Sequence, residues 1–185
     1  MLELGQIDNT WTLFLDRDGV INHEKEKDYI YHYGEFTFYD GVRSALQYLS
    51  TRFGKIIIIT NQRGVGRSLM TENDLLSIHE QMLADIEASG GRVHKIYYCV
   101  ANDDAHPNRK PNPGMAQDAL RDFPEIDLSK SIMVGNKLSD MQFGRNAGMY
   151  TVFVQTTDPE LQLPHKSIDL AFADLPSFAK ALQNT

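Results

Sequence analysis

Four short polar segments of the sequence combine the residue types that phosphoryl transfer requires. They are Asp16-Arg17-Asp18-Gly19, Thr60-Asn61-Gln62, Arg109-Lys110-Pro111 and Gly135-Asn136-Lys137, with Asp140 just beyond. A carboxylate can attack phosphorus and form an aspartyl-phosphate, which splits one difficult displacement into two easier ones. A second carboxylate can protonate the leaving oxygen and then activate water. Mg²⁺, a lysine and neutral hydrogen-bond donors would cancel the repulsion between an anionic nucleophile and a phosphate.

The elements around these segments predict how they are positioned. Continuous apolar runs at 11–15, 56–59, 94–100, 131–134 and 150–154 are typical of strands that are buried on both faces of a parallel sheet. Helical patterns occupy 40–53, 71–89, 113–123, 140–147 and 175–182, and Thr71 is a predicted N-cap. This alternation predicts an α/β fold, a doubly wound, mainly parallel sheet with helices on both faces. Ligands collect at the carboxyl ends of such strands, so the four segments should converge there.

Length and composition narrow the class of protein. With 185 residues we expect one domain spanning 1–185, and the net charge of −7 disfavours a general nucleic-acid-binding surface. The N-terminal residues do not resemble a signal peptide, and no apolar run approaches the roughly 20 residues that span a membrane. The single cysteine, Cys99, cannot form an internal disulfide and fits a reducing compartment. We therefore expect a cytoplasmic monomer that binds neither nucleic acid nor membrane.

Each polar segment alone also fits an ordinary structural role. Asp-x-Asp-Gly after a strand has the composition of a simple turn, and Gly135-Asn136 is a good turn dipeptide. Thr60-Asn61 could merely end a strand, and Lys110 could be a solvated loop lysine. Arg63 and Arg67 could be solvent-facing charges. Function is indicated by the occurrence of all the segments, in this order, at four predicted strand ends.

The ordered set Asp16-x-Asp18-Gly19, Thr60-Asn61, Lys110 and Gly135-Asn136…Asp140 resembles the haloacid dehalogenase superfamily of phosphohydrolases. The resemblance covers about residues 11–154. Within it, four stretches look like the branch that contains heptose bisphosphate phosphatases and histidinol phosphatases. These stretches are FLDRDGVIN (14–22), TNQRGVGR (60–67), RKPNPGM (109–115) and VGNKLSDM (134–141).

The resemblance implies a role for each matching residue. Asp16 would be the nucleophile and Asp18 the general acid/base, and Mg²⁺ would be bound by Asp16, the main-chain carbonyl of Asp18 and Asn136. The residues expected to hold the phosphoryl group and the rest of the substrate are Thr60, Asn61, Gln62, Arg67, Arg109 and Lys110. Asp140 and Lys137 are expected directly behind them, with Asp140 orienting Lys110 or metal-bound water.

The sequence departs from the family pattern at two places. The family usually has Asp where this chain has Asn136, so we expect weakened but not abolished Mg²⁺ binding. The related zinc loop carries Cys-x-His and Cys-x-Cys pairs. Here Cys99 stands at the first of those four positions, while Ala101, His106 and Asn108 replace the others. Two candidate ligands are too few for structural zinc, so no zinc is expected.

Spacing predicts an open site without a separate cap domain. Only 41 residues lie between Asp18 and Thr60, and 49 between Thr60 and Lys110. Loops 22–39, 63–69 and 101–108 would then select the substrate, which the resemblance implies is a small phosphorylated metabolite, a sugar (bis)phosphate. The leading candidate is D-glycero-D-manno-heptose 1,7-bisphosphate, hydrolysed at the 7-phosphate. Histidinol phosphate and a polynucleotide 3′-phosphate are the enzyme alternatives, and a phosphate-ligand binding protein with impaired turnover is the alternative outside enzymes.

Overall fold

The computed structural model describes residues 2–185; Met1, the first residue of the predicted domain, lies outside them. The strands are β1 Thr12–Leu15, β2 Lys55–Asn61, β3 Lys95–Cys99, β4 Ser131–Gly135, β5 Tyr150–Val154 and β6 Leu170–Phe172. The α-helices are α1 Val42–Arg52, α2 Arg63–Gly66, α3 Glu72–Ala88, α4 Gly114–Asp122, α5 Leu138–Ala147 and α6 Leu175–Gln183. Short 3₁₀-helices are η1 Leu4–Gln6, η2 Tyr33–Glu35 and η3 Leu128–Lys130.

The strands form one sheet in the order β3-β2-β1-β4-β5-β6. All neighbouring pairs are parallel. The chain builds outward from β1 to β3, then returns to the other side of β1 and continues from β4 to β6. The winding direction therefore reverses between β1 and β4, which is the point of an open α/β sheet where ligands bind. The predicted doubly wound parallel fold is confirmed.

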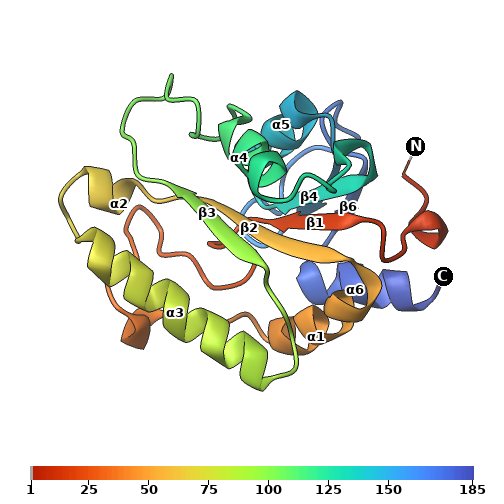
Figure 1. Ribbon diagram of the computed structural model, residues 1–185, viewed down its shortest axis with the longest axis horizontal. Coiled ribbons are helices and arrows are strands. Elements are labelled where there is room, and N and C mark those ends of the chain that lie inside the picture. The colour runs from red at the N-terminus through yellow and green to blue at the C-terminus, as the bar shows by residue number, and fades with distance from the viewer. Residues whose placement is uncertain (1) are drawn as a thin grey trace.

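Apolar side chains cover both faces of the sheet, as the continuous hydrophobic runs predicted. Along β1, Leu13 and Leu15 face one core, and Phe14 faces the other. The first core is closed by α1, α3 and α6, and the second by α4 and α5. Figure 1 shows this layering, with α4 and α5 above the sheet and α1, α3 and α6 below it. The tight packing on both sides holds the strand ends in fixed positions.

Local signals in the sequence account for the ends of the longest helix. The Thr71 hydroxyl accepts a hydrogen bond from the backbone N–H of Asp74 at 3.1 Å. Asp74 Oδ2 in turn accepts from the backbone N–H of Thr71 at 2.8 Å. This reciprocal cap satisfies two donors that a helix start would otherwise leave unpaired. At the other end Gly90 adopts a positive φ of 80°, which ends the helix where the sequence predicted it.

The structure adds two elements to the predicted ones, and several predicted elements have ends that differ by one or two residues. β6 was not predicted, because its three residues are only half-buried and give a weak hydrophobic signal. α2 falls in a stretch interpreted as a loop, since two of its four residues are glycines. α5 begins at Leu138 rather than at residue 140.

The described residues between β1 and β2 hold only a loop, η2 and α1, so the expectation of no separate cap is confirmed. None of the helices among residues 2–185 has the length and apolar character needed to cross a membrane.

Candidate active site

The sheet brings the four predicted polar segments together at one edge. Leu15, the last residue of β1, is paired with Ile58 of β2 and Val134 of β4. Asp16 therefore stands level with the end of β4 and with the residue that precedes Thr60 in β2. A cavity of about 570 Å³ opens at this edge. The predicted residues that line it are Asp16, Asp18, Thr60, Asn61, Gln62, Arg67, Arg109, Lys110, Lys137 and Asp140. Asn136 lies outside this lining and is fully buried.

Lys110 connects the strand ends at the floor of the cavity. Its Nζ lies 2.9 Å from Asp16 Oδ1 and 2.7 Å from Asp140 Oδ1, and it donates to the carbonyl oxygen of Ile59 at 2.9 Å. Burial lowers the pKa of Lys110, but Asp140 and Asp16 outweigh this effect and raise it above its usual range. Lys110 is therefore a fixed cation beside Asp16, where it can bind a phosphoryl oxygen.

Asp16 lies in surroundings that are more negative than Lys110 can neutralise. Burial raises the pKa of Asp16 to about 6; Lys110 opposes this shift, and the carboxylates of Asp140 and Asp18 add to it. Three carboxylates thus share two buried cations, Lys110 and Arg17, which leaves one excess negative charge. A bound metal cation would cancel this excess and favour the ionised form of Asp16 that can attack phosphorus.

Asp18 is held as an ionised carboxylate by three side chains. Arg17 Nη2 lies 3.0 Å from both carboxylate oxygens, Asn22 Nδ2 donates to Oδ1 at 3.0 Å, and Gln62 Nε2 donates to Oδ2 at 2.8 Å. Burial acts to raise the pKa of Asp18, but Arg17, Asn22 and Gln62 together hold it below its usual range. The ionised form can accept a proton from water. To donate a proton to a leaving group, Asp18 must first be protonated. The Asp18 side chain must then move away from the Arg17 guanidinium group.

Arg17 and His79 belong to the site although the sequence assigned them no catalytic or binding role. Arg17 is 1% exposed, and its Nη1 lies 3.1 Å from Nε2 of His79 on α3. Burial and the nearby Arg17 charge lower the pKa of His79 to about 3. His79 is therefore neutral, and its ring nitrogen can accept the hydrogen bond from Arg17. The only sequence signal for His79 is a polar residue on the buried stripe of α3, beside Ile78 and Met82.

Thr60 and Asn61 hold different parts of the site. The side chain of Asn61 bonds to the main chain of Lys110 in both directions: Nδ2 donates to its carbonyl oxygen at 3.2 Å, and Oδ1 accepts from its N–H at 3.1 Å. Asn61 thereby fixes the backbone from which Lys110 reaches the cavity. The Thr60 hydroxyl oxygen accepts from Gln62 Nε2 at 2.9 Å, which leaves its own proton available for a phosphoryl oxygen.

Asn136 offers a ligand atom for Mg²⁺. Its side-chain oxygen is buried and has no hydrogen-bond partner among residues 2–185. The amide packs against Gly19 of the Asp-x-Asp-Gly turn, where a Cβ would come within 2.0 Å of Nδ2. Amide and carboxylate oxygens are suitable ligands for Mg²⁺, which keeps several waters and needs few protein ligands. The orphaned oxygen and the excess negative charge around Asp16 therefore fit this ion.

Three arginines, of which Arg67 is exposed and Arg63 and Arg109 are half-buried, form the rim of the cavity on the side of the loop that follows β3. Arg109 Nε donates to Asp104 Oδ1 at 2.9 Å, and its Nη1 donates to the carbonyl oxygen of Ala101 at 3.2 Å. Arg63 pairs with the same carboxylate, and Arg67 lines the same cavity. The Asp104 side chain is 83% exposed. The rim therefore offers guanidinium groups to an anionic part of a substrate beyond the transferred phosphate.

The segment 22–39, predicted as a loop or hairpin near the site, forms the opposite wall. Much of its first half lines the cavity, and Glu24 bridges to Lys137 at 2.6 Å. Its second half packs on α3, where the Tyr33 hydroxyl donates to Asp85 at 2.6 Å. Two short antiparallel contacts, including an isolated bridge between residues 22 and 38, give it a hairpin-like base. The segment is thus both packed and in contact with the cavity.

The loop that corresponds to the zinc loop is held by polar contacts. Cys99 Sγ lies 3.7 Å from His106 Nδ1, and Asn108 Nδ2 donates to Asp118 at 2.7 Å. Within residues 2–185, no three His, Cys, Asp or Glu side chains are grouped as a metal site would need. The expectation of no zinc stays a prediction.

Fold and site together define a phosphatase of the haloacid dehalogenase type. Comparison with family models makes the assignment specific, because the model described as "Polynucleotide kinase 3 phosphatase" matches residues 6–177. The chain belongs to this family.

Individual relatives point to one branch of phosphatases. A D-glycero-alpha-D-manno-heptose-1,7-bisphosphate 7-phosphatase from Campylobacter jejuni is 37% identical over 145 residues, covering 78% of this chain and 82% of the relative. A D-glycero-beta-D-manno-heptose-1,7-bisphosphate 7-phosphatase from Photorhabdus laumondii is 35% identical over 183 residues, covering 92% of this chain and 96% of the relative. A crystal structure of D,D-heptose 1.7-bisphosphate phosphatase from B. bronchiseptica, complexed with magnesium and phosphate, superposes with a TM-score of 0.85 at 29% identity. The superposition covers 94% of this chain and 98% of that one.

Proposed function

We propose that the chain is a Mg²⁺-dependent phosphatase that passes the phosphoryl group of its substrate through Asp16. The observation that carries this proposal is the arrangement around Lys110. Its ammonium nitrogen lies 2.9 Å from Asp16 and 2.7 Å from Asp140, at the junction of the β1, β2 and β4 strand ends. A carboxylate held against a buried cation, in a cavity open to solvent, is placed to attack an incoming phosphate.

In the first step, Lys110, Thr60 and the backbone around Asn61 would hold the phosphoryl oxygens while Asp16 attacks phosphorus. The P–O bond to the substrate breaks as the bond to Asp16 forms, and the leaving oxygen takes a proton from Asp18, which must enter this step in its protonated form. Mg²⁺, when bound by Asp16, the main-chain carbonyl of Asp18 and Asn136, supplies positive charge that lowers the repulsion between carboxylate and phosphate. These ligands and roles follow the family pattern.

In the second step, water replaces Asp16 on phosphorus. Asp18, left ionised after the first step, takes a proton from that water. Arg17, Asn22 and Gln62 stabilise the ionised form of Asp18 from which this step starts. Free inorganic phosphate then leaves through the open cavity.

The preferred substrate of this proposal is D-glycero-D-manno-heptose 1,7-bisphosphate, with the 7-phosphate removed. The support is twofold: the names of the relatives above, and the arginines on the rim. Arg109 and Arg63 now share one exposed carboxylate, Asp104, and a second phosphate would be a stronger bidentate partner for them. The proposal includes a single phosphatase domain that acts as a cytoplasmic monomer.

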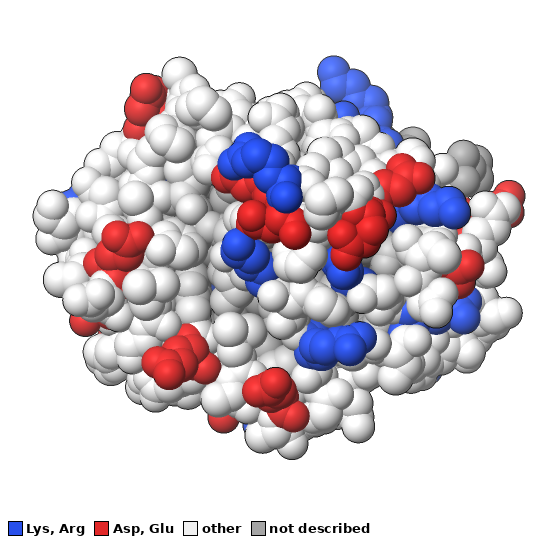
Figure 2. All heavy atoms as spheres, in the orientation of Figure 1, with Lys and Arg blue, Asp and Glu red and all other residues white. Residues whose placement is uncertain are grey.

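A 3′-phosphorylated polynucleotide is a second candidate, because the matching family model carries that description. The surface gives it little support. On the face shown in Figure 2, acidic and basic side chains lie next to one another over α4 and β3. Lys95 pairs with Asp122 at 2.6 Å, and Lys55 with Glu125 at 2.7 Å. A mixed-sign face of this kind does not form the basic track that nucleic-acid backbones require.

A substrate panel tests the proposed function. The wild-type protein is assayed for phosphate release from heptose 1,7-bisphosphate, simple sugar monophosphates, histidinol phosphate and a 3′-phosphorylated oligonucleotide, with Mg²⁺ or with EDTA. We expect Mg²⁺-dependent release, fastest from the bisphosphate and absent in the Asp16→Asn variant. Equal release from wild type and variant would overturn the enzyme assignment, and a preference for the oligonucleotide would overturn the substrate. Tight binding of phosphorylated ligands without any release would support the non-enzymatic alternative.

A further inference from the structure

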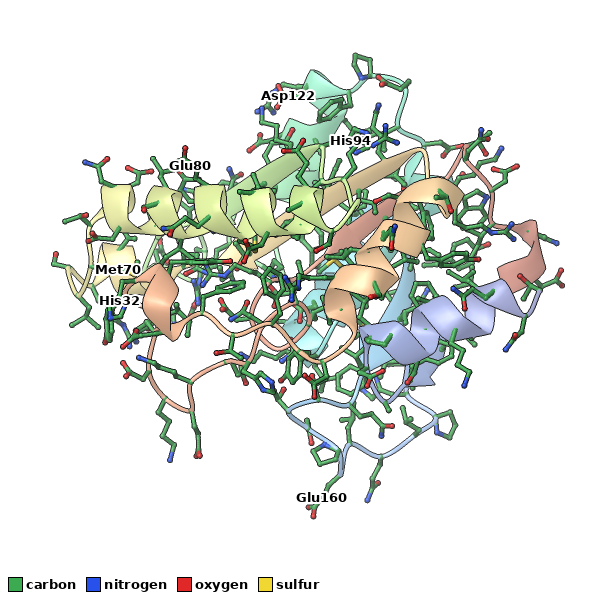
Figure 3. The ribbon with its side chains drawn as sticks, turned by 90° about the horizontal axis from the view of Figure 1, so that it is seen from below. His32, Met70, Glu80, His94, Asp122 and Glu160 are labelled. Carbon is green, nitrogen blue, oxygen red and sulfur yellow. The ribbon has the colours of Figure 1, made fainter. Side chains whose placement is uncertain are left out.

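The loop between β5 and β6 contacts the metal side of the site through two threonines. Asn136 Nδ2 donates to Thr157 Oγ1 at 2.7 Å, and the Thr156 hydroxyl donates to the carbonyl oxygen of Gly19. Figure 3 shows Glu160 farther along the same loop, pointing away from the body of the protein. The start of this loop therefore touches both Asn136 and the turn that follows β1, while the rest extends outward.

The nitrogen and the oxygen of the Asn136 side-chain amide differ in whether they have a hydrogen-bond partner. The residue is 0% exposed. Its nitrogen is paired with Thr157, but its oxygen is buried without a partner among the described residues. A buried acceptor without a partner is costly, so something outside the chain normally satisfies it. A Cβ at Gly19 would come within 2.0 Å of the amide nitrogen and 3.0 Å of the oxygen, so a partner of the oxygen would sit beside the Asp16–Gly19 turn.

Because residue 136 is an amide and not a carboxylate, the orientation of its side chain determines whether it can bind a cation. A carboxylate at this position could present either of two equivalent oxygens to a cation. An amide has one oxygen and one NH₂ group, and the NH₂ end repels a cation. A cation bound by the oxygen therefore cannot pair with the nitrogen, which needs an acceptor of its own.

We propose that Thr157 is a positioning residue for the Mg²⁺ site, because its hydroxyl oxygen accepts the Asn136 NH₂ group and thereby holds the Asn136 oxygen toward the metal. The inference rests on the proposed function only in assuming that Mg²⁺ binds at Asn136. It explains how a chain with Asn in place of the usual carboxylate keeps a usable ligand.

Titration of the metal-free protein with Mg²⁺ tests the inference without any substrate. Binding is measured by calorimetry and by the Mg²⁺-dependent rise in unfolding temperature, for wild type, Thr157→Val and Thr157→Ser. Thr157→Val removes the acceptor, so the NH₂ group is left unpaired whenever Mg²⁺ holds the oxygen. We expect Mg²⁺ affinity to fall about tenfold or more. Thr157→Ser keeps a hydroxyl and should stay within about threefold of wild type, since the hydrogen bond can still form.

Repeating the Thr157 substitution in a protein that also carries Asn136→Asp makes the test specific. In Asn136→Asp, either carboxylate oxygen can face the cation, so Thr157→Val should cost clearly less affinity than it does beside Asn136. Unfolding in EDTA checks that each variant folds, and Thr157→Ala replaces Thr157→Val with the same expectation if the valine variant does not. Equal Mg²⁺ affinity in wild type and Thr157→Val would overturn the inference alone. Absence of Mg²⁺ binding in the wild type would overturn the metal requirement of the proposed function and the inference with it.

Discussion

The floor and the rim of the cavity are built in opposite ways. On the floor, Lys110 and Asp140 are 4% and 1% exposed, and they are fixed by contacts between different strand ends. On the rim, the Asp104 side chain is 83% exposed, and it pairs with Arg63 of α2 and with Arg109 of its own loop. A buried, cross-linked floor can fix one chemistry, whereas an exposed rim can change its partners. We infer that the floor determines the reaction and the rim selects the substrate.

The largest expected effect comes from the nucleophile on the floor. Asp16→Asn keeps the shape of the side chain but removes its nucleophilic oxygen, so kcat should fall by about 10⁴-fold or more. The measurement is the steady-state rate of phosphate release, together with an unfolding curve that shows the variant folds. Retention of even a tenth of the wild-type rate would remove Asp16 from the reaction.

Lys110→Met should have the next largest effect, because it removes the cation that Asp16 and Asp140 share. We expect kcat to fall by about 10²–10³-fold, the usual cost of losing one preorganised charge at a reacting phosphate. Stability should also fall by about 3–5 kcal/mol, since the two carboxylates are left buried without their partner.

Lys137→Met is the matched control for that prediction. Lys137 lines the same cavity but has a side chain that is 52% exposed, and its only ion pair among the described residues is with Glu24. Its loss should change kcat by less than about tenfold. Equal losses for the two lysines would show that the floor has no special role.

Arg109→Ala tests the rim through the distinction between KM and kcat. KM for the bisphosphate should rise about 10- to 100-fold, the cost of losing a charged hydrogen-bond partner, with little change in kcat. KM for a sugar monophosphate should change far less, because such a substrate has no second phosphate to contact. Equal rises for both substrates would assign Arg109 to the transferred phosphate instead.

Asp104→Asn should give a small effect of the opposite sign. The Asp104 carboxylate competes with substrate for Arg63 and Arg109, and exposed ion pairs of this kind contribute about 0.2–1 kcal/mol. Its removal should lower KM for the bisphosphate by up to about fivefold. Asp103→Asn is the control, since Asp103 lies next to Asp104 but forms no ion pair among the described residues; it should leave KM unchanged.

A change in stability with pH follows from the buried charges on the floor. Burial raises the pKa of Asp16 to about 6, above the value of 3.8 for the unfolded chain. Between these values the folded protein binds more protons than the unfolded one, so this carboxyl group destabilises the metal-free protein increasingly as pH rises from 4 to 6. In EDTA, Asp16→Asn should therefore melt higher than wild type by several degrees at pH 7, given about 2–4 °C per kcal/mol for a chain of this size. The gap should narrow toward pH 4; a constant gap would contradict this account.

The sequence predicted the floor better than the rest of the site, for a physical reason. Asp16 and Asn136 directly follow strands, and Thr60 lies near the end of one; the apolar runs of these strands are unmistakable, and parallel strands must end at the same edge of a sheet. Lys110 comes from a loop and not from a strand end. Its place in the ordered set of polar segments still predicted that it lies at this edge of the sheet.

The contacts that sequence could not supply are those between distant elements. Nothing in the local pattern indicates that His79 of α3 reaches Arg17, or that Thr157 meets Asn136 across 21 positions of the chain. Such pairs depend on how helices and loops pack on the finished sheet. β6 and α2 were missed for a different reason: both are too short, and too weakly apolar or too rich in glycine, to give a periodic signal.

Trapping the covalent intermediate tests the central claim most directly. The wild-type protein is mixed with Mg²⁺ and with substrate that is labelled on the transferred phosphate, quenched in acid within one turnover, and digested to locate the label. We expect the label on Asp16 with heptose bisphosphate and also with a simple monophosphate, because the floor performs the same step for both. A label on another residue, or a full turnover during which Asp16 never carries phosphate, would contradict the account.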